Sequence, residues 1–196
     1  RIEVVNHCVE LADVAPCTGT RLKAVTLTPR HSEAAFETVI EGHLLRNGYV
    51  AIARGGFDRE RAIFPETVLA FIRETQPKEW AKLEALHGER TGEQILGDLC
   101  KWMDQNGSLG TLRHGFKCYG RTLHAAFFKA AHELNPELEA RYAANRVGLT
   151  RQLHFSPRSE KSLDVTLSLN GIPVATVELK NPLTGQRVED ARRQYK

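Results

Sequence analysis

Apolar and polar residues alternate from Leu163 to Leu169, which predicts a strand with one face in the core. A second run over 172–179 is mostly apolar and β-branched, as expected for a strand that is buried on both faces. Asn170-Gly171 lies between the two runs and is a strong signal for a tight hairpin turn. We therefore expect an antiparallel hairpin over 163–180.

The rest of the chain predicts helices first and short strands later. Apolar residues at helical spacing predict a helix over 31–47, with Ser32 as its N-cap, followed by an extended segment over 49–53. The segment 58–104 is expected to be helical, with Trp80 in the core. The remaining expected elements are strands over 111–117 and 123–128, a helix over 136–144, a strand over 146–155 and a helix from Val188.

Charged residues interrupt the apolar hairpin at Asp164, Glu178 and Lys180. Such groups are rarely placed in apolar surroundings without a partner or a metal. Two carboxylates and an amine around one point suit a hard cation, which lowers the pKa of a bound water. The pattern therefore predicts a site that hydrolyses phosphodiesters. The alternative is a surface hairpin that carries a solvated Glu-x-Lys pair.

The alternation also constrains the register of the hairpin. A plain two-residue loop sets Asp164 opposite Val177, and Glu178 then points to the other face of the sheet. A shared site needs one extra residue, either in a three-residue loop over 170–172 or in a bulge. Pro173 favours an irregular pairing, because proline cannot donate to the ladder. A regular hairpin would rule out the catalytic interpretation.

The segment DVTLSLNGIPVATVELKNPLTGQ begins with Asp164 and contains, fourteen residues later, Glu178-Leu179-Lys180. This pattern resembles the D…ExK signature of PD-(D/E)xK nucleases, and the whole stretch resembles the nuclease motif of type I restriction enzyme R subunits. The resemblance implies an α/β fold, with a mixed sheet flanked by helices and a helical insert at about 58–104. It also implies that Asp164 and Glu178 bind Mg²⁺ with the main-chain carbonyl of Leu179. Lys180 would then orient the attacking water.

Residues outside the hairpin bear on the same resemblance. Many such nucleases carry an accessory glutamate on the helix before the sheet, which corresponds to Glu37 here, with Glu33 as the competing candidate. The alternative is a solvated acidic helix face. Related R subunits place a glutamine four residues before a tyrosine. This chain departs from that pattern, because Ala191 stands four residues before Tyr195 and the glutamine is Gln194.

An R subunit would carry an endonuclease domain over 31–196, after an unassigned extension over 1–30. It would continue beyond Lys196 into an ATP-driven motor. The implied partners are double-stranded DNA and separate methylation and specificity subunits. Two other classes stay open: a non-catalytic DNA-binding or assembly module, and a stand-alone structure-specific nuclease of the same fold.

Composition adds limits to these hypotheses. The 196 residues carry a net charge of +3. The segment 141–161 holds five basic residues and one acid, and this excess of positive charge suits either contact with a DNA backbone or a solvated loop. No apolar run is long enough to span a membrane, and no GxxxxGK[ST] or GxGxxG motif is present to bind a nucleotide. The cysteines show no zinc-ligand spacing and indicate free thiols in a reducing cytoplasm: Cys8, Cys17, Cys100 and Cys118.

Overall fold

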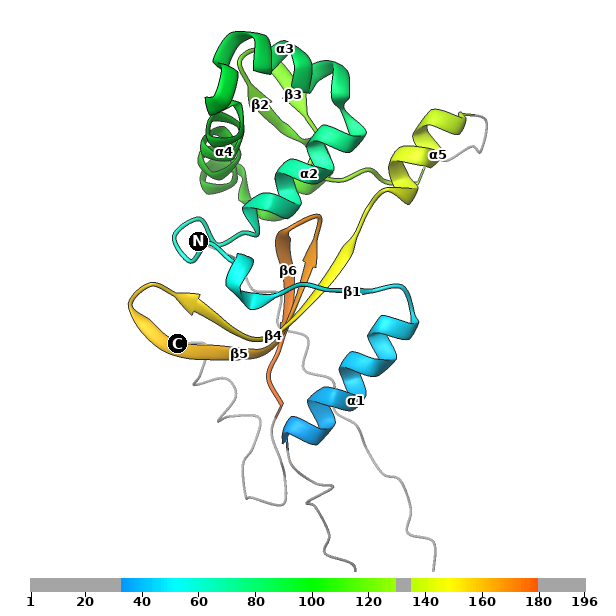
Figure 1. Ribbon diagram of the computed structural model, residues 1–196, viewed down its shortest axis with the longest axis vertical. Helices are drawn as coiled ribbons and strands as arrows, with labels where there is room; N and C mark the ends of the chain where they lie inside the picture. Colours follow the sequence, from blue (N-terminus) through cyan, green and yellow to red (C-terminus); the bar gives the residue numbers. More distant parts are fainter. Residues whose placement is uncertain (1–32, 130–134, 180–196) are drawn as a thin grey trace, which may run out of the picture.

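The computed structural model describes residues 33–129 and 135–179 (Figure 1). A four-stranded mixed sheet has the order β1-β4-β5-β6, in which β1 runs parallel to β4 and the other neighbours are antiparallel. Its strands are β1 (Val50–Ala51), β4 (Val147–Ser156), β5 (Ser159–Leu169) and β6 (Ile172–Val177). The expected mixed α/β fold is therefore confirmed, and its central strands β4 and β5 are antiparallel.

Helices and a small hairpin gather at one end of this sheet, while α1 lies at the other end (Figure 1). Three of the helices begin with a proline at a first-turn position, where its missing N–H is not needed. The elements are α1 (Glu33–Arg46), α2 (Pro65–Thr75), α3 (Pro77–His87), α4 (Thr91–His114), β2 (Phe116–Cys118), β3 (Arg121–Leu123) and α5 (Pro136–Ala143).

The main apolar core lies in the helical end of the molecule. Side chains of α2, α3 and α4 pack there with the β2–β3 hairpin, and Trp80 is buried among them as predicted. Ile172, the first residue of β6, also belongs to this core. The β5–β6 hairpin is therefore anchored to the helical part at the start of β6.

The turn between β5 and β6 makes further contacts with that part. Gly171 accepts a hydrogen bond from the Phe64 N–H at 2.8 Å, just before α2. The buried Asn170 side chain donates to the Ala125 carbonyl and to Asn145 Oδ1, both at 2.9 Å, and accepts from the Arg146 N–H at 2.8 Å. These bonds fix the point at which the β5–β6 ladder begins.

Several expected boundaries are wrong. The strand predicted over 111–117 begins only at Phe116, because α4 continues through Thr111 to His114. Gly107 takes a non-helical conformation (φ 73°, ψ 159°), so α4 consists of two helical parts that meet there at a kink. The strand predicted over 123–128 ends at Leu123. The helical segment thus reaches beyond the expected limit of 104.

β6 does not have the expected burial on both faces. It is an edge strand of the described sheet, and Val174 is 40% exposed. The apolar sequence of this run reflects packing at its start, where Ile172 is buried, rather than coverage of its whole length.

Some predictions lie outside the described residues: the N-cap Ser32, the cysteines Cys8 and Cys17, the lysine Lys180 and the helix from Val188. Within the described ranges, Cys100 and Cys118 are free thiols, as predicted. No helix of 33–129 or 135–179 is long and apolar enough to cross a membrane.

Candidate active site

A bulge in β6 sets the register of the candidate acids. Leu169 pairs with Ile172 across a two-residue turn, in which Asn170 and Gly171 have positive φ angles of 51° and 91°. This geometry is typical of hairpin turns, and the alternative three-residue loop is wrong. The predicted bulge is confirmed, because Ser168 pairs with Pro173 whereas Leu167 pairs with Ala175.

Val174 is the extra residue of this bulge. Beyond it the ladder is regular again, and its last recorded pair joins Val165 to Val177. The next step of the register sets Asp164 opposite Glu178. Since directly opposed residues share a face of the sheet, the bulge turns the two acids to the same side.

The backbone after β6 lies against Asp164. The Leu179 N–H donates a hydrogen bond to Asp164 Oδ2 at 2.7 Å, and the Leu179 side chain is buried. Both carboxylate oxygens of Glu178 are shielded from solvent. Asp164, Glu178 and the main chain of Leu179 are therefore brought together. Lys180, the next residue, lies outside the described part of the chain.

The third acid comes from α1. Glu37 is only 4% exposed, so the alternative of a fully solvated acidic face is wrong for this residue. The apolar stripe expected on the same helix is instead partly outward, since Phe36 and Val39 are exposed. Glu33 is part of α1, but the surroundings of its side chain lie outside the described structure. The structure therefore places Glu37 at the sheet.

Arg151 of β4 holds Glu37 in place. Its guanidinium donates to Glu37 Oε2 from Nε at 3.0 Å and from Nη2 at 2.9 Å, and to Glu41 Oε2 at 2.8 Å. These bonds, first that to Glu41 and then that to Glu37, raise the pKa of Arg151 above its usual value, although burial opposes them. The arginine stays charged and neutralises the buried carboxylate.

Gln152 connects this acid to the hairpin. Its Nε2 donates to Glu37 Oε1 at 2.8 Å and to Asp164 Oδ1 at 3.3 Å. Nothing in the sequence pattern singles out this residue, since a glutamine inside a strand carries no distinct signal. Among the described residues no group of three or more His, Cys, Asp and Glu side chains is close enough to hold a metal by itself.

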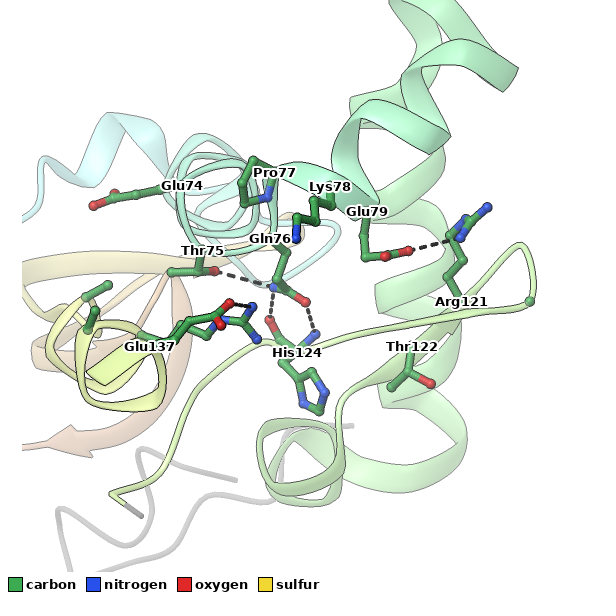
Figure 2. A pocket seen from close by; sticks show the side chains of 14 residues that line it. Glu74, Thr75, Gln76, Pro77, Lys78, Glu79, Arg121, Thr122, His124 and Glu137 are labelled. Carbon is green, nitrogen blue, oxygen red and sulfur yellow. Dashed lines mark hydrogen bonds and ion pairs between the residues drawn. The ribbon is translucent and has the colours of Figure 1, made fainter. Parts of the chain in front are cut away.

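A pocket of about 770 Å³ lies elsewhere, between the α2–α3 junction, β3 and α5. Its polar groups bind one another: the Gln76 side chain accepts from the His124 N–H and donates to the His124 carbonyl, and Arg121 pairs with Glu79 (Figure 2). None of the acids around Asp164 lines it. It is a junction between elements rather than the candidate site.

The sheet and its acids define a mixed α/β domain with an acidic candidate site at the β5–β6 hairpin. Residues 128–196, about a third of the chain, match the family described as Type I restriction enzyme R protein N terminus. The resemblance to R subunits is confirmed over this range, which includes the hairpin, Gln152 and Lys180 but not Glu37. No curated protein and no solved structure matches the chain.

The Arg151 ion pair gives a first prediction, for Arg151→Ala. The Glu37 side chain is 5% exposed and that of Arg151 28%, so the change leaves a buried carboxylate without its cation. We expect the free energy of unfolding to fall by about 2–4 kcal/mol, measured by urea denaturation.

Arg146→Ala is the matched control, because the Arg146–Glu74 pair is about half exposed on both sides and should contribute less than about 1 kcal/mol. Adding Glu37→Gln to Arg151→Ala should recover part of the loss. Equal effects of the two arginine substitutions would show that the Glu37 pair is not buried in solution.

Proposed function

We propose that this chain contains a Mg²⁺-dependent endonuclease domain of the PD-(D/E)xK type, which cleaves phosphodiester bonds of double-stranded DNA within a type I restriction enzyme R subunit. The observation that carries the proposal is the Val174 bulge, because it turns Asp164 and Glu178 to one face of the hairpin. The family match over 128–196 supports the same function.

The donor set fits a hard cation. Asp164 and Glu178 offer carboxylate oxygens, and the hydrogen bond from the Leu179 N–H brings that residue's backbone beside Asp164. Mg²⁺ prefers such oxygen ligands and retains several waters. We propose that Asp164, Glu178 and the Leu179 carbonyl hold the ion. When bound, Mg²⁺ would supply a water of lowered pKa and stabilise charge on the phosphoryl oxygens.

The remaining residues would orient the reactants. Lys180 would position the attacking water or stabilise negative charge that develops on the phosphate. Glu37 would act from α1 as the accessory acid, through its contact with Gln152 beside Asp164. The alternative role for Glu37 is that of a purely structural partner of Arg151, in which case Glu37→Gln would change stability but not cleavage.

Basic residues near the hairpin would hold the DNA. The exposed Arg158 lies in the β4–β5 turn and the exposed Lys161 near the start of β5, in the part of this hairpin that projects away from the helices (Figure 1). Such contacts attract the phosphate backbone without reading sequence. In the proposed cytoplasmic enzyme, an ATP-driven motor and separate methylation and specificity subunits would complete the activity. The endonuclease domain would span 31–196 with its helical insert, after the unassigned 1–30.

Two variants test this function in the R subunit assembled with its partner subunits, ATP and double-stranded DNA. Glu178→Ala should weaken Mn²⁺ or Mg²⁺ binding by at least about 10-fold in calorimetry and abolish cleavage. Lys180→Ala should lower the cleavage rate by roughly 100-fold but leave ion affinity unchanged, because the amine is not a ligand. ATP hydrolysis should persist in both.

The outcomes separate the candidate classes. A non-catalytic DNA-binding or assembly module predicts that both variants retain the cleavage activity of the assembled enzyme. Equal ion affinity in wild-type protein and Glu178→Ala would contradict the proposed metal site. Robust site-specific cleavage by the purified chain alone would contradict the assignment to a multisubunit restriction enzyme.

A further inference from the structure

Gln152 has a backbone conformation that a strand does not normally contain. Its φ angle is +49°, although it lies inside β4. The β4–β5 ladder pairs Arg151 with Val165 and Leu153 with Leu163, and Gln152 between them is not among the paired residues. A left-handed conformation is unfavourable at a residue with a side chain and is concentrated at functional sites.

This conformation has a direct consequence for the side chains. Successive residues of a regular strand project to opposite faces, yet Arg151 and Gln152 both bind Glu37. The change of backbone direction at Gln152 allows both to reach α1. The result is that one buried carboxylate accepts from a guanidinium on Oε2 and from an amide on Oε1.

The orientation of the amide is determined by its neighbours. Ionised carboxylates can only accept hydrogen bonds, so the group that faces both Glu37 and Asp164 must be Nε2. On the other side, the Ser162 hydroxyl donates to Gln152 Oε1 at 3.0 Å. The NH2 group of Gln152, which carries partial positive charge, therefore lies between the Glu37 and Asp164 carboxylates. A cation bound between them would supply positive charge in the same way.

We propose that Gln152 is a positioning residue of the acidic site: its amide bridges Glu37 and Asp164 while no ion is bound, and it withdraws from Asp164 when that carboxylate binds a cation. This inference rests on the proposed metal-dependent function. The contact of Nε2 to Asp164 is the longer of the two, 3.3 Å against 2.8 Å to Glu37. It is therefore the hydrogen bond that would break when the cation binds. Gln152 would keep Glu37 aligned through both states.

The bridge itself is tested without metal, by thermal denaturation in EDTA. Gln152→Ala removes the donor and should lower the melting temperature by about 2–6 °C. Gln152→Glu preserves the shape but adds a third carboxylate, so it should melt at a still lower temperature. A double-mutant cycle of Gln152→Ala with Glu37→Gln should show coupling. If the wild-type protein, Gln152→Ala and Gln152→Glu have the same melting temperature in EDTA, the proposed amide bridge is overturned.

The exchange step is tested by Mn²⁺ calorimetry on the same proteins. Gln152→Ala should bind Mn²⁺ about 3- to 10-fold more tightly than wild-type protein, because no amide has to be displaced. A merely structural role predicts weaker binding instead, and this result would overturn the proposal. Gln152→Glu should bind more tightly still and gain a larger increase in melting temperature from Mn²⁺. If the wild-type protein and both variants bind no Mn²⁺, the proposed function and the exchange step fail together. The EDTA melting order then decides the amide bridge alone.

Discussion

Gly171→Ala is expected to lower the free energy of unfolding by about 2–5 kcal/mol, the sum of two separate costs. Gly171 has a φ angle of +91°, which side chains disfavour. A Cβ atom there would lie 2.7 Å from the Phe64 carbonyl oxygen and 2.9 Å from Val68 Cγ2. Because one of these atoms belongs to the backbone, the turn would have to move away from α2 and its hydrogen bond from the Phe64 N–H would weaken.

Gly120→Ala is the matched control for this prediction. Gly120 also has a positive φ angle, +75°, in a hairpin turn, but an added Cβ would meet nothing within 4 Å. It carries the conformational cost alone, about 1–2 kcal/mol. Urea denaturation of both variants separates the two contributions. If Gly171→Ala costs no more than Gly120→Ala, the β5–β6 turn does not pack against α2 in solution.

The hairpin could be predicted from the sequence because its signals are local. Strict alternation to Leu169 and the Asn170-Gly171 pair indicate two strands and their turn within a few residues. The bulge could be predicted only by combining the alternation of side chains between the two faces of the sheet with the hypothesis that Asp164 and Glu178 share a site. The sequence alone did not choose between a longer loop and a bulge. The structure places the extra residue at Val174, next to Pro173.

The contacts around Glu37 could not be predicted in the same way. Arg151 and Glu37 are 114 residues apart, and no local pattern identifies such a pair. Helical spacing of Phe36 and Val39 predicted the wrong inner face for α1, since the acids Glu37 and Glu41, rather than this apolar stripe, bind Arg151 of β4. The left-handed backbone at Gln152 was equally hidden, because glycine or asparagine is the usual sign of that conformation.

The extent of α4 shows a different limit of local signals. The helical segment was expected to end at 104, just before Asn106-Gly107, a pair that is common in turns. In the structure the chain bends at Gly107 and becomes helical again, with Thr111 and Leu112 buried. Burial of the following turn outweighs the local cost at the glycine.

Asp164→Asn is expected to lower DNA cleavage by the proposed restriction enzyme by roughly 100- to 1000-fold. An asparagine oxygen can still accept the hydrogen bond from the Leu179 N–H, so the backbone beside the site should be retained. What is lost is the negative charge opposite Glu178, which a divalent ion requires. The substitution thereby separates the charge of Asp164 from its contact with Leu179, although it also removes the acceptor of the longer contact from Gln152.

The measurement is the cleavage rate of plasmid DNA, with ATP hydrolysis and the melting temperature recorded on the same preparation. Glu137→Gln is the matched control, since Glu137 is an exposed acid on α5 whose side chain is 71% accessible. It should leave all three quantities unchanged. If Asp164→Asn keeps wild-type cleavage, the reacting phosphate is not bound at the β5–β6 hairpin, whatever the register of its acids. If cleavage and ATP hydrolysis fall together, the site affects assembly or the motor rather than the chemical step. Loss of cleavage alone, with the fold and ATP hydrolysis intact, is the outcome that the Val174 bulge and the Leu179 contact lead us to expect.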